Sequence, residues 1–213
     1  GRIAYANIKK IVLFLLSCGM AEVLFCLLSI GLGYDLPLLA IQLLWINVVT
    51  DGLQDVALSF EVATKDLMKA KPISPKESLF NKSLMLEVAI FGIAIATMIF
   101  TVWKNLMDRN TDLVFARSII MMLMVFIQNI HVLNCRSEKN SVFATNLFTN
   151  PLVIITIVGS IILQLIVTET PFFAKMLNIV SLPVKTIVII FCFSLLIILV
   201  AEIYKFIYRK FCL

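Results

Sequence analysis

Long runs of apolar residues, separated by short polar stretches, dominate this chain. Six runs are long enough to cross a bilayer, because a helical crossing needs about 20 residues. Their approximate limits are 11–33, 36–60, 84–103, 113–133, 152–167 and 184–204. The runs are apolar all round rather than striped on one face, as expected of membrane-spanning helices. The pattern predicts an all-α polytopic membrane protein, in which six transmembrane helices form one domain over residues 1–213.

Composition agrees with this class and excludes a soluble domain. The 213 residues are 61% hydrophobic and 15% charged, against about 45–50% and 25% in soluble domains, and the mean hydropathy is +1.03. The net charge of +5 does not indicate nucleic-acid binding, because the Lys and Arg residues lie between the apolar runs. The five cysteines are scattered, with no CxxC pair, so neither a disulfide framework nor a thiolate metal site is expected.

The basic residues predict the orientation of the chain. Five of the 18 Lys and Arg residues flank one set of span ends, and the other thirteen flank the opposite set. Such an imbalance places the richer side in the cytoplasm. Both termini and the long polar loop at 61–82 are therefore predicted to be cytoplasmic. The five residues on the poorer side are Lys104, Arg109, Arg117, Lys175 and Lys185.

The second apolar run contains the most informative polar group of the chain. Asn47, Thr50 and Asp51 have i, i+3, i+4 spacing, which places three oxygen-bearing side chains on one helix face. An ionised carboxylate within hydrocarbon costs about 2.5–3.5 kcal/mol on insertion scales, so it requires a compensating partner. Gly52 follows and allows the helix to loosen and expose backbone carbonyls. The run predicts an intramembrane cation site.

Four further polar residues within the predicted spans bear on this site. Glu22 is in the middle of the first span, where a carboxylate predicts cation or proton handling. Asp55 is one turn beyond Asp51; it either extends the site or is a hydrated residue near the membrane surface. Gln128, in the fourth span, is either a ligand or a hydrogen-bonding group between helices. His131 is the single histidine of the chain and is poor support for a metal site.

The candidate ligands carry oxygen donors alone. Carboxylate, amide and hydroxyl oxygens suit hard cations such as Ca²⁺, Na⁺, K⁺, Mg²⁺ and Mn²⁺, whereas soft metals prefer thiolate or imidazole. Three classes of protein remain open at this point: part of an ATP-driven pump, a freestanding channel or secondary carrier, and a truncated membrane fragment that transports nothing. Because the chain begins with Gly1 rather than Met, we expect it to be a piece of a longer protein.

The stretch 42–53, QLLWINVVTDGL, resembles the sixth transmembrane helix of type II P-type ATPases, the Ca²⁺-pump-like branch. Residues 17–23, SCGMAEV, are similar to the ligand-bearing turn of the fifth helix in that family. Weaker similarities follow in the same order along the chain, at 1–10, 66–68, 72–77, 133–138 and 202–205. The resemblance implies that the chain comprises helices five to ten of a cation pump.

The resemblance also implies a set of ion ligands, and the chain differs from the family at two further ligand positions. Glu22, Asn47, Thr50 and Asp51 match positions that ligate the transported ion. In the two-site Ca²⁺ pumps an Asn stands at the position of Gly19 and a Glu at the position of Gln128. The loss of these two ligands leads to the hypothesis that one ion, or a different ion, is carried per cycle. Gln54 and Asp55 replace the family's usual Pro-Ala, which adds a carboxylate.

Several family elements are absent from these 213 residues. The phosphorylation motif, the nucleotide-binding domain and the fourth helix are missing, so the chain is not expected to hydrolyse ATP alone. ATP and Mg²⁺ would act only through cytoplasmic domains of the parent pump, which with its N-terminal helices and the bilayer are the expected partners. The loop 61–82 is expected to dock on the phosphorylation domain. Ca²⁺ is the preferred cargo, and a bacterial inner membrane, a eukaryotic endomembrane and a plasma membrane are all compatible with the sequence.

Overall fold

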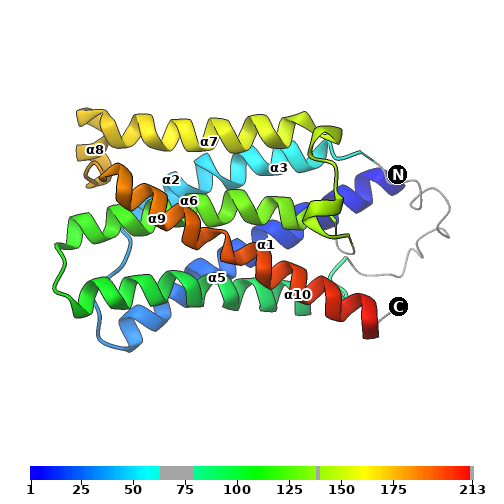
Figure 1. Cartoon of the computed structure of the whole chain (residues 1–213), viewed down its shortest axis with the longest axis horizontal. Helices are drawn as coiled ribbons and strands as arrows, with labels where there is room; N and C mark the ends of the chain where they lie inside the picture. The colour runs from blue at the N-terminus through cyan, green and yellow to red at the C-terminus, as the bar shows by residue number, and fades with distance from the viewer. Residues whose placement is uncertain (63–78, 138–139, 212–213) are drawn as a thin grey trace.

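The computed structural model describes residues 1–62, 79–137 and 140–211. Most of the predicted 61–82 loop therefore lies outside the described residues, as do the matches at 66–68 and 72–77. The described chain is helical throughout (Figure 1). Its helices are α1 Arg2–Gly31, α2 Ala40–Val49, α3 Asp51–Ser59, α5 Lys82–Asp108, α6 Leu113–Cys135, 3₁₀ segments η1 Val142–Ala144 and η2 Leu147–Thr149, α7 Pro151–Glu169, α8 Pro171–Leu177, α9 Val184–Ser194 and α10 Leu196–Phe211.

Five helical segments of the described chain are long and apolar enough to cross a membrane: α1, α5, α6, α7 and the α9–α10 pair. The predicted second span is instead divided into α2 and α3, neither of which is long enough alone. Together they run along the bundle between its two ends (Figure 1). The chain is an integral, multi-pass, all-helical membrane protein.

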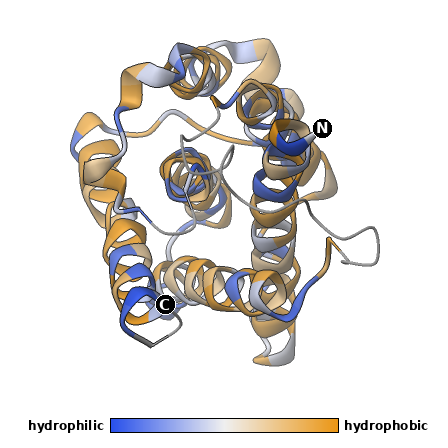
Figure 2. Cartoon of the chain, turned by 90° about the vertical axis from the view of Figure 1, so that its right-hand side faces the viewer, coloured by the Kyte–Doolittle hydropathy of each residue, from blue (hydrophilic) through white to orange (hydrophobic). Residues whose placement is uncertain are grey.

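Helix α6 forms the centre of the bundle. Nineteen of its 23 residues are buried, and it packs against α1, α2, α3, α5, α7, α9 and α10. Figure 2, which looks along the bundle, shows one helix surrounded by the others. A helix that is apolar all round is typical of such a central position. Polar groups on α6 can therefore meet partners from several helices at once.

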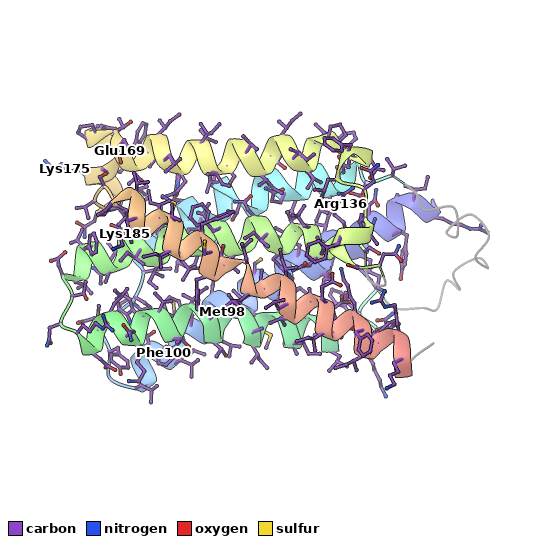
Figure 3. All side chains as sticks on the ribbon, in the orientation of Figure 1. Met98, Phe100, Arg136, Glu169, Lys175 and Lys185 are labelled. Carbon is purple, nitrogen blue, oxygen red and sulfur yellow. The ribbon has the colours of Figure 1, made fainter. Side chains whose placement is uncertain are left out.

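The N- and C-termini lie at the same end of the bundle (Figure 1), as an even number of crossings requires. Arg136 lies at this end, whereas Lys175 and Lys185 lie at the opposite end (Figure 3). These positions agree with the alternation of basic residues along the sequence. The assignment of the basic end to the cytoplasm stays a prediction.

The connection between α1 and α2 is longer than residues 34–35, the two that separate the first two predicted spans. Eight residues, 32–39, separate the two helices, because Pro37 disfavours helical backbone at the residue before it. Gly33 has a φ of +78°, which turns the chain directly after α1. The buried Arg117 of α6 donates from Nη2 to the carbonyl of Leu36 at 2.7 Å, so the connection is fixed to the central helix.

Candidate functional site: a polar centre at the α2–α3 break

The helical ladder is interrupted at Thr50. The amide of Thr50 bonds the carbonyl of Ile46 at 2.8 Å, and the ladder resumes with the amide of Gln54 on the carbonyl of Thr50 at 2.9 Å. Between these bonds, the described backbone shows no helical bond from the amides of residues 51–53 to the carbonyls of residues 47–49. The loosening expected from Gly52 is therefore present, and it leaves carbonyl oxygens available. Interrupted transmembrane helices coordinate cations with such carbonyls.

A chain of hydrogen bonds joins three of the predicted ligands across three segments. The hydroxyl of Thr50 donates to Oε1 of Gln128 at 2.5 Å. Nε2 of Gln128 in turn donates to Oε1 of Glu22 on α1 at 3.0 Å. Thr50 is fully buried, and Gln128 and Glu22 are 1% and 8% exposed. The structure thus places Gln128 within the candidate site.

The two aspartates of α3 lie beside this chain. Asp51 is close enough to Glu22 and to Asp55 for their charges to interact. One buried oxygen of each, Oδ1 of Asp51 and Oδ1 of Asp55, has no hydrogen-bond donor among the described residues. Buried carboxylate oxygens without donors are the groups that a bound cation would satisfy.

The candidate site is open on one side. Asn47 lies in interaction range of Glu22 but is itself exposed, and so are its apolar neighbours Leu44 and Val48, at 60% and 58%. Among the described residues, no three His, Cys, Asp or Glu side chains converge as a complete metal cluster. The arrangement thus places three carboxylates, two amides, a hydroxyl and free carbonyls along one wall of a site.

A second polar network lies behind this wall. Gln54 donates to Oδ1 of Asn129 at 2.7 Å and accepts from the hydroxyl of Thr156 at 2.8 Å. Asn129 donates to the hydroxyl of Ser160 at 2.9 Å. These bonds tie α3 to α6 and α7. Gln54 and Asn129 were visible in the sequence as polar residues within apolar runs, but nothing there indicated that they pair.

A buried ion pair fixes the chain just beyond α3. The guanidinium of Arg136 donates to both carboxylate oxygens of Glu61, with Nη2 to Oε1 at 2.9 Å and Nε to Oε2 at 3.0 Å. Both side chains are almost fully buried, at 1% and 6% exposure. In the sequence, Glu61 and Arg136 have opposite charges and lie at the ends of two separate predicted spans. This was the available signal, but it did not show that the two residues pair.

Two asparagines complete the attachment of this segment, which we call the Glu61 clamp (Asn7, Glu61, Arg136 and Asn150). Nδ2 of Asn150, at the start of α7, donates to Oε2 of Glu61 at 3.0 Å and to the carbonyl of Ala57 at 2.9 Å. Nδ2 of Asn7 on α1 donates to the carbonyl of Glu61 at 2.9 Å. The clamp therefore holds the end of α3 to α1, α6 and α7 at once.

Residues 35–207 match a family described as "Cation transporting ATPase, C-terminus". The chain belongs to this family. It corresponds to the C-terminal membrane region of P-type ATPases, as the resemblance of its second span implied. The matched range includes α2 and α3 and therefore the break at Thr50.

Individual relatives extend the match over almost the whole chain. A calcium-transporting ATPase of Bacillus subtilis (strain 168) is 39% identical over 172 residues, covering 80% of this chain and 19% of that protein. Calcium-transporting ATPase 1 of Bacillus cereus (strain ATCC 10987 / NRS 248) is 30% identical over 96% of this chain and 25% of its own length. Calcium-transporting ATPase type 2C member 1 of Homo sapiens is 31% identical over 99% and 23%. The chain spans about a fifth to a quarter of the length of these relatives.

Proposed function

We propose that this chain supplies one wall of the ion path of an ATP-driven Ca²⁺ pump. The ligands would be Glu22, Asn47, Thr50 and Asp51, with Gln128 as a further ligand or positioning group. The observation that carries the proposal is the meeting of Glu22, Gln128 and Thr50 at an interrupted helix, beside carboxylate oxygens that have no donor in the described part of the chain. Oxygen donors of this kind suit Ca²⁺, and the relatives are called calcium-transporting ATPases.

The remaining ligands and the energy source would come from the rest of the pump. The exposed side of Asn47, with Leu44 and Val48 around it, is an apolar face with a polar centre. Such a face is suited to cover by further transmembrane helices. ATP and Mg²⁺ would act in cytoplasmic domains, and movement there would reach Glu22 along α1, whose 30 residues span about 45 Å.

The test of the cargo is ion-dependent phosphorylation of the full-length protein. With Mg-ATP present throughout, we expect Ca²⁺ to stimulate phosphoenzyme formation at lower concentration than Mn²⁺, and Na⁺ and K⁺ to have no effect. Radioactive ATP and acid quenching measure the phosphoenzyme directly. Stimulation by Na⁺ or K⁺ but not by Ca²⁺ would overturn the choice of cargo while leaving the pump assignment in place.

The site is proposed to hold one Ca²⁺ per cycle. Gly19, one turn before Glu22, contributes no ligand, and Gln128 uses its amide to donate to Glu22 rather than to add a negative charge. Apart from the neighbouring backbone of α1, a Cβ atom added at Gly19 would meet no atom within 4 Å, so there is space for a side chain to begin there. This space makes the second site testable by substitution.

The double variant Gly19→Asn/Gln128→Glu is expected to raise bound Ca²⁺ from about one to about two per phosphorylation site. A glutamate at 128 would face Glu22 without a donor between them, and a second cation would compensate that repulsion. Equilibrium binding of radioactive Ca²⁺, normalised to phosphoenzyme, measures the ratio. Two ions bound by the unmodified protein would contradict the one-ion proposal.

A further inference from the structure

An open groove of about 530 Å³ runs between the first turns of α5 and the last turns of α10. These two segments lie side by side at the end of the bundle that holds both termini (Figure 1). The walls are apolar, with Leu86 and Ile90 on α5 and Val200 and Ile203 on α10. Leu86 and Ile203 are 59% and 61% exposed, so the groove opens on the outer face of two membrane-spanning helices. No other described segment lines it.

One end of the groove is polar and basic. Lys82 and Tyr208 line that end, and Arg209 and Lys210 follow in the last turn of α10. The carboxylates of the two helices are directed elsewhere, because Glu202 accepts from the amide of Val142 at 2.8 Å and Glu87 is 3% exposed. A basic pocket between transmembrane helices is suited to an anionic lipid headgroup.

The length of the groove matches half a bilayer. Lys82 and Ile90 are eight residues apart on α5, about 12 Å along a helix axis, whereas one leaflet of the hydrocarbon core is about 15 Å thick. The apolar walls thus extend from the membrane surface toward the midplane. We propose that the groove binds one anionic phospholipid, with its phosphate at Lys82 and Tyr208 and an acyl chain along Leu86 and Ile203.

The dimensions favour a lipid over a helix of another protein. A transmembrane partner helix crosses the whole hydrocarbon core of about 30 Å, and it would leave most of its length outside a groove of about 12 Å. The basic end also suits a phosphate, which accepts hydrogen bonds from lysine and tyrosine. This proposal does not depend on which ion the protein carries.

Retention of lipid by the full-length protein tests the site. The protein is purified from membranes of mixed phosphatidylglycerol and phosphatidylcholine, washed in detergent, and its retained phospholipid is measured by mass spectrometry. We expect about one tightly held phosphatidylglycerol per protein. Lys82→Gln should lower the preference for the anionic lipid about five-fold, and Ile203→Trp, which fills the groove, should remove the tightly held lipid.

Matched controls lie elsewhere on the same chain. Lys185→Gln removes an exposed lysine at the opposite end of the bundle, and Ile155→Trp places the same ring on an exposed position of α7; both should retain lipid as the unmodified protein does. Leu86→Trp provides a second groove-filling variant, should Ile203→Trp elute as an aggregate. The proposal is overturned if the unmodified protein shows no anionic enrichment. It is equally overturned if a photo-crosslinker at position 203 captures a polypeptide instead of lipid.

Discussion

Replacing Asp51 by asparagine is expected to abolish Ca²⁺-dependent phosphorylation of the full-length pump. Asp51 carries a buried oxygen without a donor among the described residues, next to the Glu22–Gln128–Thr50 chain. Asparagine keeps the shape of the side chain but removes the charge that a divalent cation needs. Loss of an outer-shell partner alone costs a metal site about 10–100-fold in affinity, so loss of a direct ligand should exceed about 100-fold. Phosphoenzyme formation across a Ca²⁺ titration measures the effect.

Asp35→Asn is the matched control for this experiment. Asp35 lies in the connection between α1 and α2, is exposed, and undergoes the same change of carboxylate to amide outside the candidate site. Its variant should phosphorylate at unchanged Ca²⁺ concentration. Both variants should elute as monodisperse protein, because asparagine keeps the size and shape of the aspartate side chain. Full activity of Asp51→Asn would refute the proposed ligand set.

The second large effect is expected at the Glu61 clamp, and it concerns stability. Arg136→Leu leaves the Glu61 carboxylate buried with the amide of Asn150 as its remaining side-chain donor among the described contacts. Removal of one partner from a buried pair typically lowers the free energy of unfolding by about 3–5 kcal/mol. Unfolding of the full-length protein in a graded denaturing detergent, followed by helical circular dichroism, measures the loss.

The double variant Glu61→Leu/Arg136→Leu tests whether the loss of stability in Arg136→Leu comes from the unpaired Glu61 carboxylate. Replacing both charges by apolar groups of similar size is often neutral, so the double variant should be more stable than Arg136→Leu alone. Lys104→Leu is the surface control, because its exposed pair with Asp108 should contribute nothing measurable. Equal losses in the single and double variants would show that the cost does not come from leaving the buried Glu61 carboxylate without its charged partner.

The apolar pattern was sufficient to predict much of this fold. Unbroken runs of about 20 residues admit few structures other than membrane-spanning helices, since backbone groups in lipid must be satisfied within the helix. The all-helical bundle was confirmed on this basis. The connection before α2 shows the limit of this prediction. Pro37 restricts the backbone of the preceding residue and so lengthens the connection, and hydropathy does not detect this effect.

The candidate site was predicted in part, and for a clear physical reason. Asp51 and Glu22 stand out because a carboxylate within an apolar run is costly, and Gly52 marked the place where the helix is interrupted. Which polar groups meet across the bundle depends on how helices rotate and pack, and sequence spacing holds no such information. The bond between Gln54 and Asn129 and the pair of Glu61 with Arg136 therefore emerged from the structure alone.

The interruption at Thr50 also bears on how the protein enters its membrane. A segment with Asp51 and Asp55 near a broken helix is a poor substrate for independent insertion, because each centrally placed aspartate costs about 2.5–3.5 kcal/mol. In the folded bundle Gln42 donates to the carbonyl of Leu177 at 2.9 Å, and Trp45 donates to Gln164 at 2.8 Å. Both partners are synthesised more than a hundred residues later. We therefore expect stable residence of this span in the bilayer to require α7 and α8, so that insertion of the chain is completed late and cooperatively.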